Sequence, residues 1–416
     1  MKPPESSTSF IINLIGLFSF LFTLYFLSQF YSEWPSNLRL VIVSIALALP
    51  IIILEYFYRR PQLLSSTRFK NNKPTIDKKR IAIKLLALYT IWSFIAFIYW
   101  VFPEYRGSFY QSYWSVLLPT LPGLIALSIP YFWFVDQRME NPKDSYYSFG
   151  LFLLGKKKFD KPVIIQLFLG WLVKLFFLPL MVVYLSGNIN KFNDINTSWE
   201  FITQDFTHIY DHLWILLFTI DLAFVTIGYV LTLRLFDSHI RSTEPTALGW
   251  LSAIICYQPF FGTLSALYLA YNLDNYTWGN WLQGQGNDIG YMIWGSIILV
   301  LLLIYALSSV MFGIRFSNLT HRGIITNGPF RYSKHPAYLS KNLSWWMISI
   351  PFISQSGHFT EVIRACSMLI LMNLVYYVRA KTEERHLMQD PVYQEYALWI
   401  DENGLISKIK RIFNPS

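Results

Sequence analysis

The sequence predicts an all-α, polytopic membrane protein, and three observations lead to this prediction. The chain of 416 residues is 54% hydrophobic and 18% aromatic but only 14% charged, whereas soluble domains carry about a quarter charged residues. Its apolar residues gather in runs of the length that crosses a bilayer as a helix, about 20 residues. Its Lys and Arg residues gather in alternate loops between these runs, as the positive-inside rule requires.

Ten apolar runs are candidates for membrane-spanning helices. They lie near residues 10–31, 40–58, 81–102, 113–135, 162–185, 212–234, 248–271, 290–313, 338–355 and 361–379. The first run is longer than a signal-peptide core and lacks a convincing small-residue cleavage site, so we expect a retained helix. The run near 338–355 is short and is the weakest candidate.

The loops support this count and predict an orientation. Basic residues are frequent in the loops 59–80, 136–161 and 314–337 and in the C-terminal tail. The intervening loops are poor in them: 186–211 contains only Lys191, and 272–289 contains no Lys or Arg. The positive-inside rule therefore predicts ten spans with both termini in the cytoplasm.

The net charge of +9 raises the question of nucleic acid. The positive residues lie beside apolar segments, which fits anionic lipid headgroups better. We therefore expect membrane lipids and no nucleic acid among the partners. The two cysteines, Cys256 and Cys366, lie in apolar stretches, so the sequence predicts neither a disulfide framework nor a metal site.

Two functional zones follow from where the polar motifs lie. Residues 1–287 form the first seven predicted spans and carry little recognisable chemistry, whereas residues 288–416 carry the polar motifs. Within the first zone, Lys174 and Asp221 fall inside predicted spans, where a charge costs at least about 2.5–3.5 kcal/mol. They are expected to face the bundle interior, either paired with each other or with backbone, or as part of an ion path.

The loop 235–247, "FDSHIRSTEPTAL", is a further candidate. His239, Arg241 and Glu244 lie on the predicted cytoplasmic side and can contribute to a site. The alternative is that Pro245 marks an ordinary helix start and the loop has no further role.

Polar residues gather at both ends of the last predicted hairpin. They occur in "GPFRYSKHPAYLSKN", 328–342, and in "RAKTEERHLMQDPVYQEY", 379–396. The two ends of a hairpin meet at one membrane face. The spacing therefore predicts a carboxylate pair, several cations, an imidazole and a tyrosine beside apolar helices. Such a site suits a small polar ligand with a positive part and a lipophilic partner; the alternative is an interfacial basic belt with salt-bridged acids.

These two motifs, in this order, resemble the C-terminal signature of the isoprenylcysteine carboxyl methyltransferase and phospholipid methyltransferase superfamily. The family pattern is a glycine turn, Arg-His-Pro-x-Tyr, a hydrophobic hairpin, and then Arg-x-x-x-Glu-Glu-x-x-Leu. The resemblance covers residues 314–400 and implies an integral membrane enzyme that uses S-adenosylmethionine, with a C-terminal helical hairpin and a site on the cytoplasmic face.

The resemblance also implies roles for individual residues. The catalytic residues would be His335, Tyr338 and Arg379, with Arg379 also binding the acceptor. Cofactor contacts would come from Arg322, Gly323, Ile324, Ile325, Gly328, Phe330, His335, Pro336, Ala337, Tyr338, Glu383 and Glu384, with Glu383 receiving the positive methionine end. The family pattern ends in a Tyr-x-x-Tyr. The sequence departs from the pattern in three places: Lys334 replaces Arg, Ser340 replaces Gly, and "LMQDPVYQEY" lacks the usual Phe-Gly before its Tyr-x-x-Tyr.

The resemblance thus predicts a membrane methyltransferase acting on a lipophilic acceptor, for example the carboxylate of a prenylated cysteine. Two alternatives remain. One is an NADPH-dependent reductase of the sterol-reductase type, which the count of ten helices favours slightly although "KHPAY" lacks the reductase Arg-His-x-Asn-Tyr pattern. The other is a transporter or scaffold resting on Lys174 and Asp221.

Overall fold

The computed structural model describes residues 3–69, 76–267, 277–283 and 286–413, and within them the protein is almost entirely helical. Eight helices are long and apolar enough to cross a membrane. They are α1 (Phe10–Phe30), α2 (Ser36–Tyr58), α4 (Lys78–Val101), α5 (Gln111–Asp136), α7 (Lys161–Asp194), α9 (Phe206–Val230), α13 (Asp288–Phe312) and α15 (Phe359–Leu387). These helices confirm the all-α class and indicate a multi-pass integral membrane protein.

Shorter elements connect these helices. They are α3 (Arg60–Thr67), α6 (Ser145–Leu153), α8 (Trp199–Ile202), α10 (Ala247–Ile254), α11 (Phe260–Leu267), α12 (Trp278–Gln283), α14 (Pro336–Ser349), α16 (Pro391–Asn403), α17 (Leu405–Phe413), the 3-10 turns η1 (Pro103–Arg106), η2 (Ser108–Tyr110), η3 (Arg234–Phe236), η4 (Gly313–Arg315) and η5 (Gly328–Arg331), and the strands β1 (Ser242–Thr243) and β2 (Thr320–His321).

Two of the ten predicted spans are not single membrane-length helices in the described residues. The run 248–271 is divided into α10 and α11, with Pro259 directly before α11; part of this run lies outside the described residues. The run 338–355 contains only α14, whose 14 residues rise about 21 Å, less than the ~30 Å hydrocarbon core. This helix ends before Pro351, which disfavours a helical residue ahead of it.

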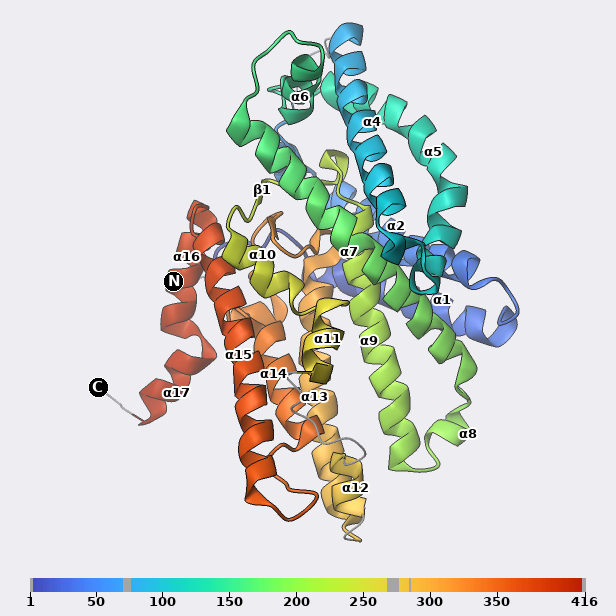
Figure 1. Cartoon of the computed structure of the whole chain (residues 1–416), viewed down its shortest axis with the longest axis vertical. Coiled ribbons are helices and arrows are strands. Elements are labelled where there is room, and N and C mark those ends of the chain that lie inside the picture. The colour runs from blue at the N-terminus through green and yellow to red at the C-terminus, as the bar shows by residue number, and fades with distance from the viewer. Residues whose placement is uncertain (1–2, 70–75, 268–276, 284–285, 414–416) are drawn as a thin grey trace.

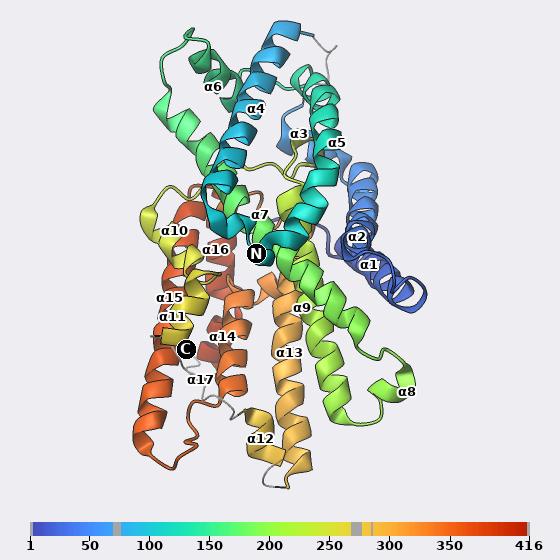
Figure 2. The ribbon, with the colours of Figure 1, turned by 45° about the vertical axis from the view of Figure 1, so that its right-hand side comes forward.

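α9 and α13 form the centre of one group of helices. α1 packs against α2, α9 packs against both α7 and α13, and α13 also contacts α14. In Figures 1 and 2, α4, α5 and α6 occupy one end of the molecule, and the starts of α13 and α15 lie at the other. α9 is the most enclosed long helix and α5 the least, so α5 presents most of its apolar surface outward.

Side chains on the outside of the bundle suit contact with lipid tails. Phe18, Phe22, Trp100 and Ile289 are large apolar residues that remain exposed. A soluble protein rarely exposes such contiguous apolar surface. Their position on candidate spans supports integration in a membrane.

The predicted intramembrane charges are partnered, but not with each other. Asp221 on α9 accepts a hydrogen bond from the Tyr305 hydroxyl at 2.9 Å and another from Ser309, both on α13. The Lys174 ammonium lies 5.0 Å from the centre of the Trp171 ring on its own helix. The expectation of a Lys174–Asp221 pair is therefore wrong, because each residue faces a different neighbour.

Short backbone contacts bring the N-terminal part to the polar end of α13. β1 and β2 form a two-stranded antiparallel ladder in which Ser242 faces His321. The N-terminal segment lies along the same stretch: the amide of Ser7 donates to the carbonyl of Ile324 at 2.8 Å. A Cβ at Gly228 would lie 2.3 Å from the carbonyl oxygen of Phe316, so α9 meets the loop after α13 only because this position is glycine. These contacts hold the backbone of residues 316–324, which leads into the first motif.

Candidate active site on the α14–α15 hairpin

The start of α14 and the end of α15 bring the two sequence motifs together. The His335 Nε2 atom lies 3.0 Å from Glu384 Oε1, and the Tyr338 hydroxyl donates to Glu383 Oε2 at 2.8 Å. Each of the two carboxylates therefore has its own partner from the opposite motif. All four residues are half-buried, which leaves the cluster accessible to a ligand.

Local chain geometry orients the imidazole and the phenol. His335 is the N-cap of α14 and Pro336 is the first helical residue, where proline is favoured because its missing N–H would have no helical partner. The His335 and Tyr338 rings stack at a centroid distance of 5.3 Å and an interplanar angle of 4°. The two parallel rings contact the carboxylates through their polar edge atoms, His335 Nε2 and the Tyr338 hydroxyl.

Arg379 lies deeper in the helical bundle than the carboxylates. Its guanidinium is buried and donates through Nη2 to Asn318 Oδ1 at 2.6 Å. It also lies 5.0 Å from the Tyr338 ring centre and 5.7 Å from the Tyr257 ring centre. No carboxylate forms an ion pair with Arg379 in the described part of the chain. Arg379 is therefore a buried cation held by an amide and aromatic faces.

The segment from Arg322 to Phe330 is fixed largely through backbone contacts. The Arg322 guanidinium is buried and donates to backbone carbonyls, including Gly228 at 2.7 Å and Ser238 at 2.6 Å; burial and the nearby Arg315 lower its pKa to about 9. Its side chain therefore supports the loop, and only its backbone is left for a ligand. Gly323 adopts φ +122° against Ser7.

The remaining predicted cofactor contacts divide into two groups. Ile324, Ile325 and Phe330 are buried, with the Phe330 ring 5.4 Å from that of Phe312. Gly328 has φ +56° and begins η5, so it provides the predicted turn. Pro336 is buried and Ala337 half-buried beside His335 in the first turn of α14.

Two tyrosines of α16 close the cluster on its other side. The Tyr396 hydroxyl donates to the Phe330 carbonyl at 2.7 Å. The Tyr393 hydroxyl is buried without a hydrogen-bond partner. Burial and then the nearby carboxylates Glu383 and Glu384 raise the pKa of Tyr393. An unsatisfied buried hydroxyl near two carboxylates is a plausible ligand contact, since buried polar groups are normally hydrogen-bonded.

The basic residues of the first motif do not form one patch. Lys334 pairs with Asp401 on α16 at 2.7 Å, and Arg331 is exposed. The Lys341 ammonium turns inward, 5.2 Å from the Tyr305 ring centre and 5.4 Å from that of Trp345. Of the alternative, an interfacial basic belt with salt-bridged acids, the salt-bridged acids are present, since Lys334 pairs with Asp401 and Lys381 with Glu384.

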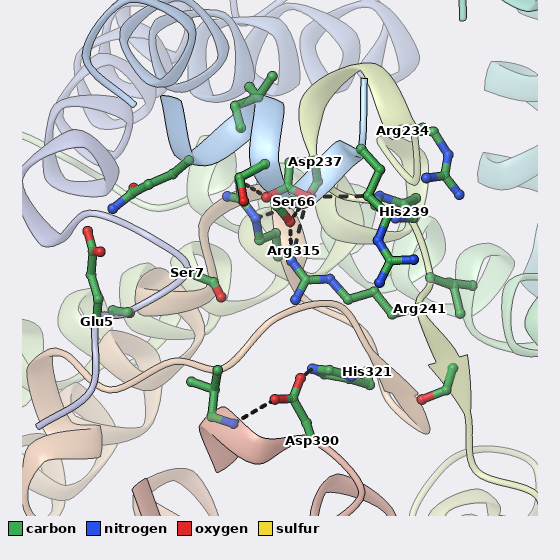
Figure 3. Close-up of a pocket in the computed structure, with 18 of the residues that line it drawn as sticks. Glu5, Ser7, Ser66, Arg234, Asp237, His239, Arg241, Arg315, His321 and Asp390 are labelled. Carbon is green, nitrogen blue, oxygen red and sulfur yellow. Dashed lines mark hydrogen bonds and ion pairs between the residues drawn. The ribbon is translucent and has the colours of Figure 1, made fainter. Parts of the chain in front are cut away.

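The loop 235–247 borders the same region without entering the motif cluster. His239 and Arg241 line a polar cavity next to the end of α15, shown in Figure 3. Glu244 instead lies 3.6 Å from Arg385 and 4.0 Å from His386. The loop therefore contacts the last turn of α15, one turn beyond Glu383.

Sequence reasoning missed Asn318, Tyr257 and the hydroxyl of Tyr393. Tyr257 lies far from both motifs along the chain, and Asn318 lies shortly before the first motif but outside it. Each reaches Arg379 only through the fold. For Tyr393, the Tyr-x-x-Tyr spacing of Tyr393 and Tyr396 is a pattern in the sequence that points to it.

Comparison with known proteins finds the family that the two motifs resemble. A sequence model described as the Isoprenylcysteine carboxyl methyltransferase (ICMT) family matches residues 289–389, from the start of α13 to just beyond α15. This confirms the resemblance for the C-terminal part of the chain. No curated protein and no solved structure matches the chain.

Proposed function

From the family match over residues 289–389, we propose that the protein is an integral membrane methyltransferase that uses S-adenosylmethionine and acts on a lipophilic acceptor. The observation that carries this proposal is the pairing of His335 with Glu384 and of Tyr338 with Glu383 across the hairpin. The two motifs that define the resemblance converge on one half-buried cluster, as a ligand site requires.

The residues of the cluster fit the cofactor that the family uses. Its methionine end carries an ammonium and a sulfonium, and the side chains of Glu383 and Glu384 offer two carboxylates beside an orphaned Tyr393 hydroxyl. The stacked rings of His335 and Tyr338 offer aromatic surface beside these carboxylates. When bound, S-adenosylmethionine would supply an electrophilic methyl group for direct displacement by the acceptor.

The protein's own task is then alignment and exclusion of water. Reactions of this kind gain chiefly from holding the two reactants in line, a contribution of up to about 7–11 kcal/mol. Tyr338 contacts both the Glu383 carboxylate and the Arg379 guanidinium. It therefore links the proposed donor side of the site to the proposed acceptor side.

Arg379 is the proposed binder of an anionic acceptor group. A buried guanidinium whose hydrogen bond goes to a neutral amide retains N–H groups for a carboxylate, which arginine binds bidentately. Its aromatic neighbours Tyr257, Tyr338 and Tyr376 provide an apolar wall for the rest of the acceptor. A carboxylate on a lipidated molecule, such as a prenylated cysteine, combines these two properties.

The count of ten helices, which favoured a sterol-reductase-type enzyme, is not reproduced by the eight candidate spans of the described residues. Cofactor preference separates the two functions directly. We expect calorimetry on the detergent-purified chain to show binding of S-adenosylhomocysteine and not of NADPH. Glu383→Gln should abolish this binding, and Glu395→Gln, on the exposed face of α16, should leave it unchanged. Binding of NADPH alone would replace the methyltransferase with a reductase.

A further inference from the structure

A large polar cavity lies beside the motif cluster. It has a volume of about 740 Å³, within the usual range for small-molecule sites. Its walls come from the N-terminal segment, the end of α2 with α3, the loop 234–242, and the junction of α15 with α16 (Figure 3). None of His335, Tyr338 or Glu383 lines it, so it is separate from the proposed methyl-transfer site.

Five arginines and four acids make up the charged lining of this cavity, together with histidines. The arginines are Arg59, Arg68, Arg234, Arg241 and Arg315, and the acids are Glu5, Glu55, Asp237 and Asp390.

The buried acids are already engaged. Arg315 lies 2.8 Å from Glu55 and 3.6 Å from Asp237. Arg241 lies 3.6 Å from the same Asp237, so two guanidinium groups share one carboxylate. Asp390 faces His321 at 3.3 Å. The fourth acid, Glu5, is exposed and, like Glu55 and Asp237, acts on the charge of Arg59 without forming an ion pair with it among the described residues.

Arg59, Arg68 and Arg234 form no ion pair with a carboxylate among the described residues. Arg59 donates to the Ser6 carbonyl and to Gln62 Oε1, both at 2.7 Å. Arg234 donates to the Thr67 carbonyl at 3.1 Å. These acceptors are neutral, and they leave N–H groups of both side chains available.

The pKa of His239 depends on its burial and on the charges around this cavity. Its imidazole lies in the same wall, and its Nδ1 is buried without a hydrogen-bond partner. Burial, followed by Arg234, Arg241, Arg322 and Arg315, lowers the pKa of His239 to about 2. Burial is thus the main cause of the shift, and the four neighbouring arginines disfavour a further positive charge on this wall.

We propose that this cavity binds a phosphate-bearing ligand. Arginine forks match phosphate oxygens bidentately and bind them with charge-assisted hydrogen bonds. The hydroxyl of Ser65 in the same walls can donate to a remaining oxygen. The few apolar residues, such as Leu63 and Ile240, do not form a channel for an acyl chain, so the site suits a headgroup or a small soluble phosphate.

The first test uses inorganic pyrophosphate as the probe on the full-length chain in detergent. Calorimetry should show binding that is weakened about tenfold or more in Arg68→Gln and in Arg234→Gln. Arg68 suits this test because its exposed side chain makes no hydrogen bond within the described residues. The exposed Arg106 on η1 supplies the matched control, Arg106→Gln, with unchanged affinity. Saturation with S-adenosylhomocysteine should not displace the probe; displacement would make the cavity part of the methyl-donor site and overturn the proposal.

The second test separates a lipid headgroup from a soluble phosphate. The chain is reconstituted in phosphatidylcholine vesicles with or without phosphatidic acid, and pyrophosphate binding is measured again. Competition by phosphatidic acid that is lost in Arg68→Gln assigns the site to a lipid headgroup, whereas unchanged binding assigns it to a soluble ligand. Absence of binding of both probes would overturn the proposal.

Discussion

At the residue scale, the proposed methyl-donor site consists of His335, Tyr338, Glu383 and Glu384. Two short polar contacts, of 3.0 and 2.8 Å, join them across the hairpin. His335 is the N-cap of α14, Tyr338 lies on its first turn, and both glutamates lie on the last turns of α15. The contacts of these residues explain why the motif contains both an imidazole and a pair of acids.

Replacing His335 should impair methyl transfer without unfolding the protein. His335→Ala removes the partner of Glu384 and the ring stacked on Tyr338, so we expect at least a tenfold loss of transfer from labelled S-adenosylmethionine, comparable to the loss of an orienting partner in other sites. His358→Ala, at an exposed position before α15, is the control. Full activity in His335→Ala would remove the motif from the site.

Replacing Arg379 should weaken binding of the acceptor and leave binding of the methyl donor largely unchanged. Arg379→Ala leaves the Glu383 and Glu384 contacts in place, so the affinity for S-adenosylhomocysteine should change little while the KM for a carboxylated acceptor rises about tenfold or more. Arg379→Lys should recover only part of the loss because it lacks the planar fork. A selective loss of donor affinity would reverse the assignment.

At the element scale, the loop between α13 and α14 is held by the N-terminal segment. The amide of Ser7 bonds to the Ile324 carbonyl at 2.8 Å, and the amide of Thr326 donates to Ser6 Oγ at 3.2 Å. This segment and the β1–β2 ladder together fix the backbone that is proposed to contact the cofactor. Contacts between residues so far apart along the chain leave no periodic pattern in a sequence.

Gly323→Ala tests the importance of this arrangement. Gly323 has φ +122°, and an added Cβ would lie 2.5 Å from Ser7 Oγ. We expect a loss of about 1–3 kcal/mol in stability from the backbone strain and a weaker affinity for S-adenosylhomocysteine, measured by thermal unfolding and calorimetry. Gly187→Ala, where nothing lies within 4 Å of an added Cβ, is the control. If both variants had the same stability and the same affinity for S-adenosylhomocysteine, backbone strain at Gly323 would not be the cause.

The imidazole of His321 on β2 should make stability depend on pH. Burial and the nearby Arg241 lower its pKa to about 4, whereas Asp390 acts in the opposite direction and His386 adds to the lowering. Below pH ~6.5 the unfolded chain binds a proton that the folded chain does not. Stability should therefore be full above pH ~6.5 and fall by about 3 kcal/mol as the pH drops to 4. Thermal unfolding across this range should show a flatter profile in His321→Gln; an unchanged profile would exclude His321 as a cause.

At the scale of the whole molecule, eight of the ten predicted spans correspond to membrane-length helices of the described residues. Hydropathy finds apolar runs but does not detect where a run is broken. Pro259 precedes α11 and Pro351 follows α14, and both mark places where an apolar stretch is no longer one helix. The motif pairs were predictable because a hairpin fixes which ends meet. The contacts of Arg379 with Asn318 and Tyr257 were not, since they depend on the packing of separate helices.

The hairpin cluster is proposed to bind the methyl donor. Hydrogen–deuterium exchange of the full-length chain, with and without S-adenosylhomocysteine, tests it most directly. The account predicts protection of residues 322–338 and 379–396, and loss of that protection in Glu383→Gln. Unchanged exchange in both segments, or protection confined to the walls of the arginine-lined cavity, would contradict it.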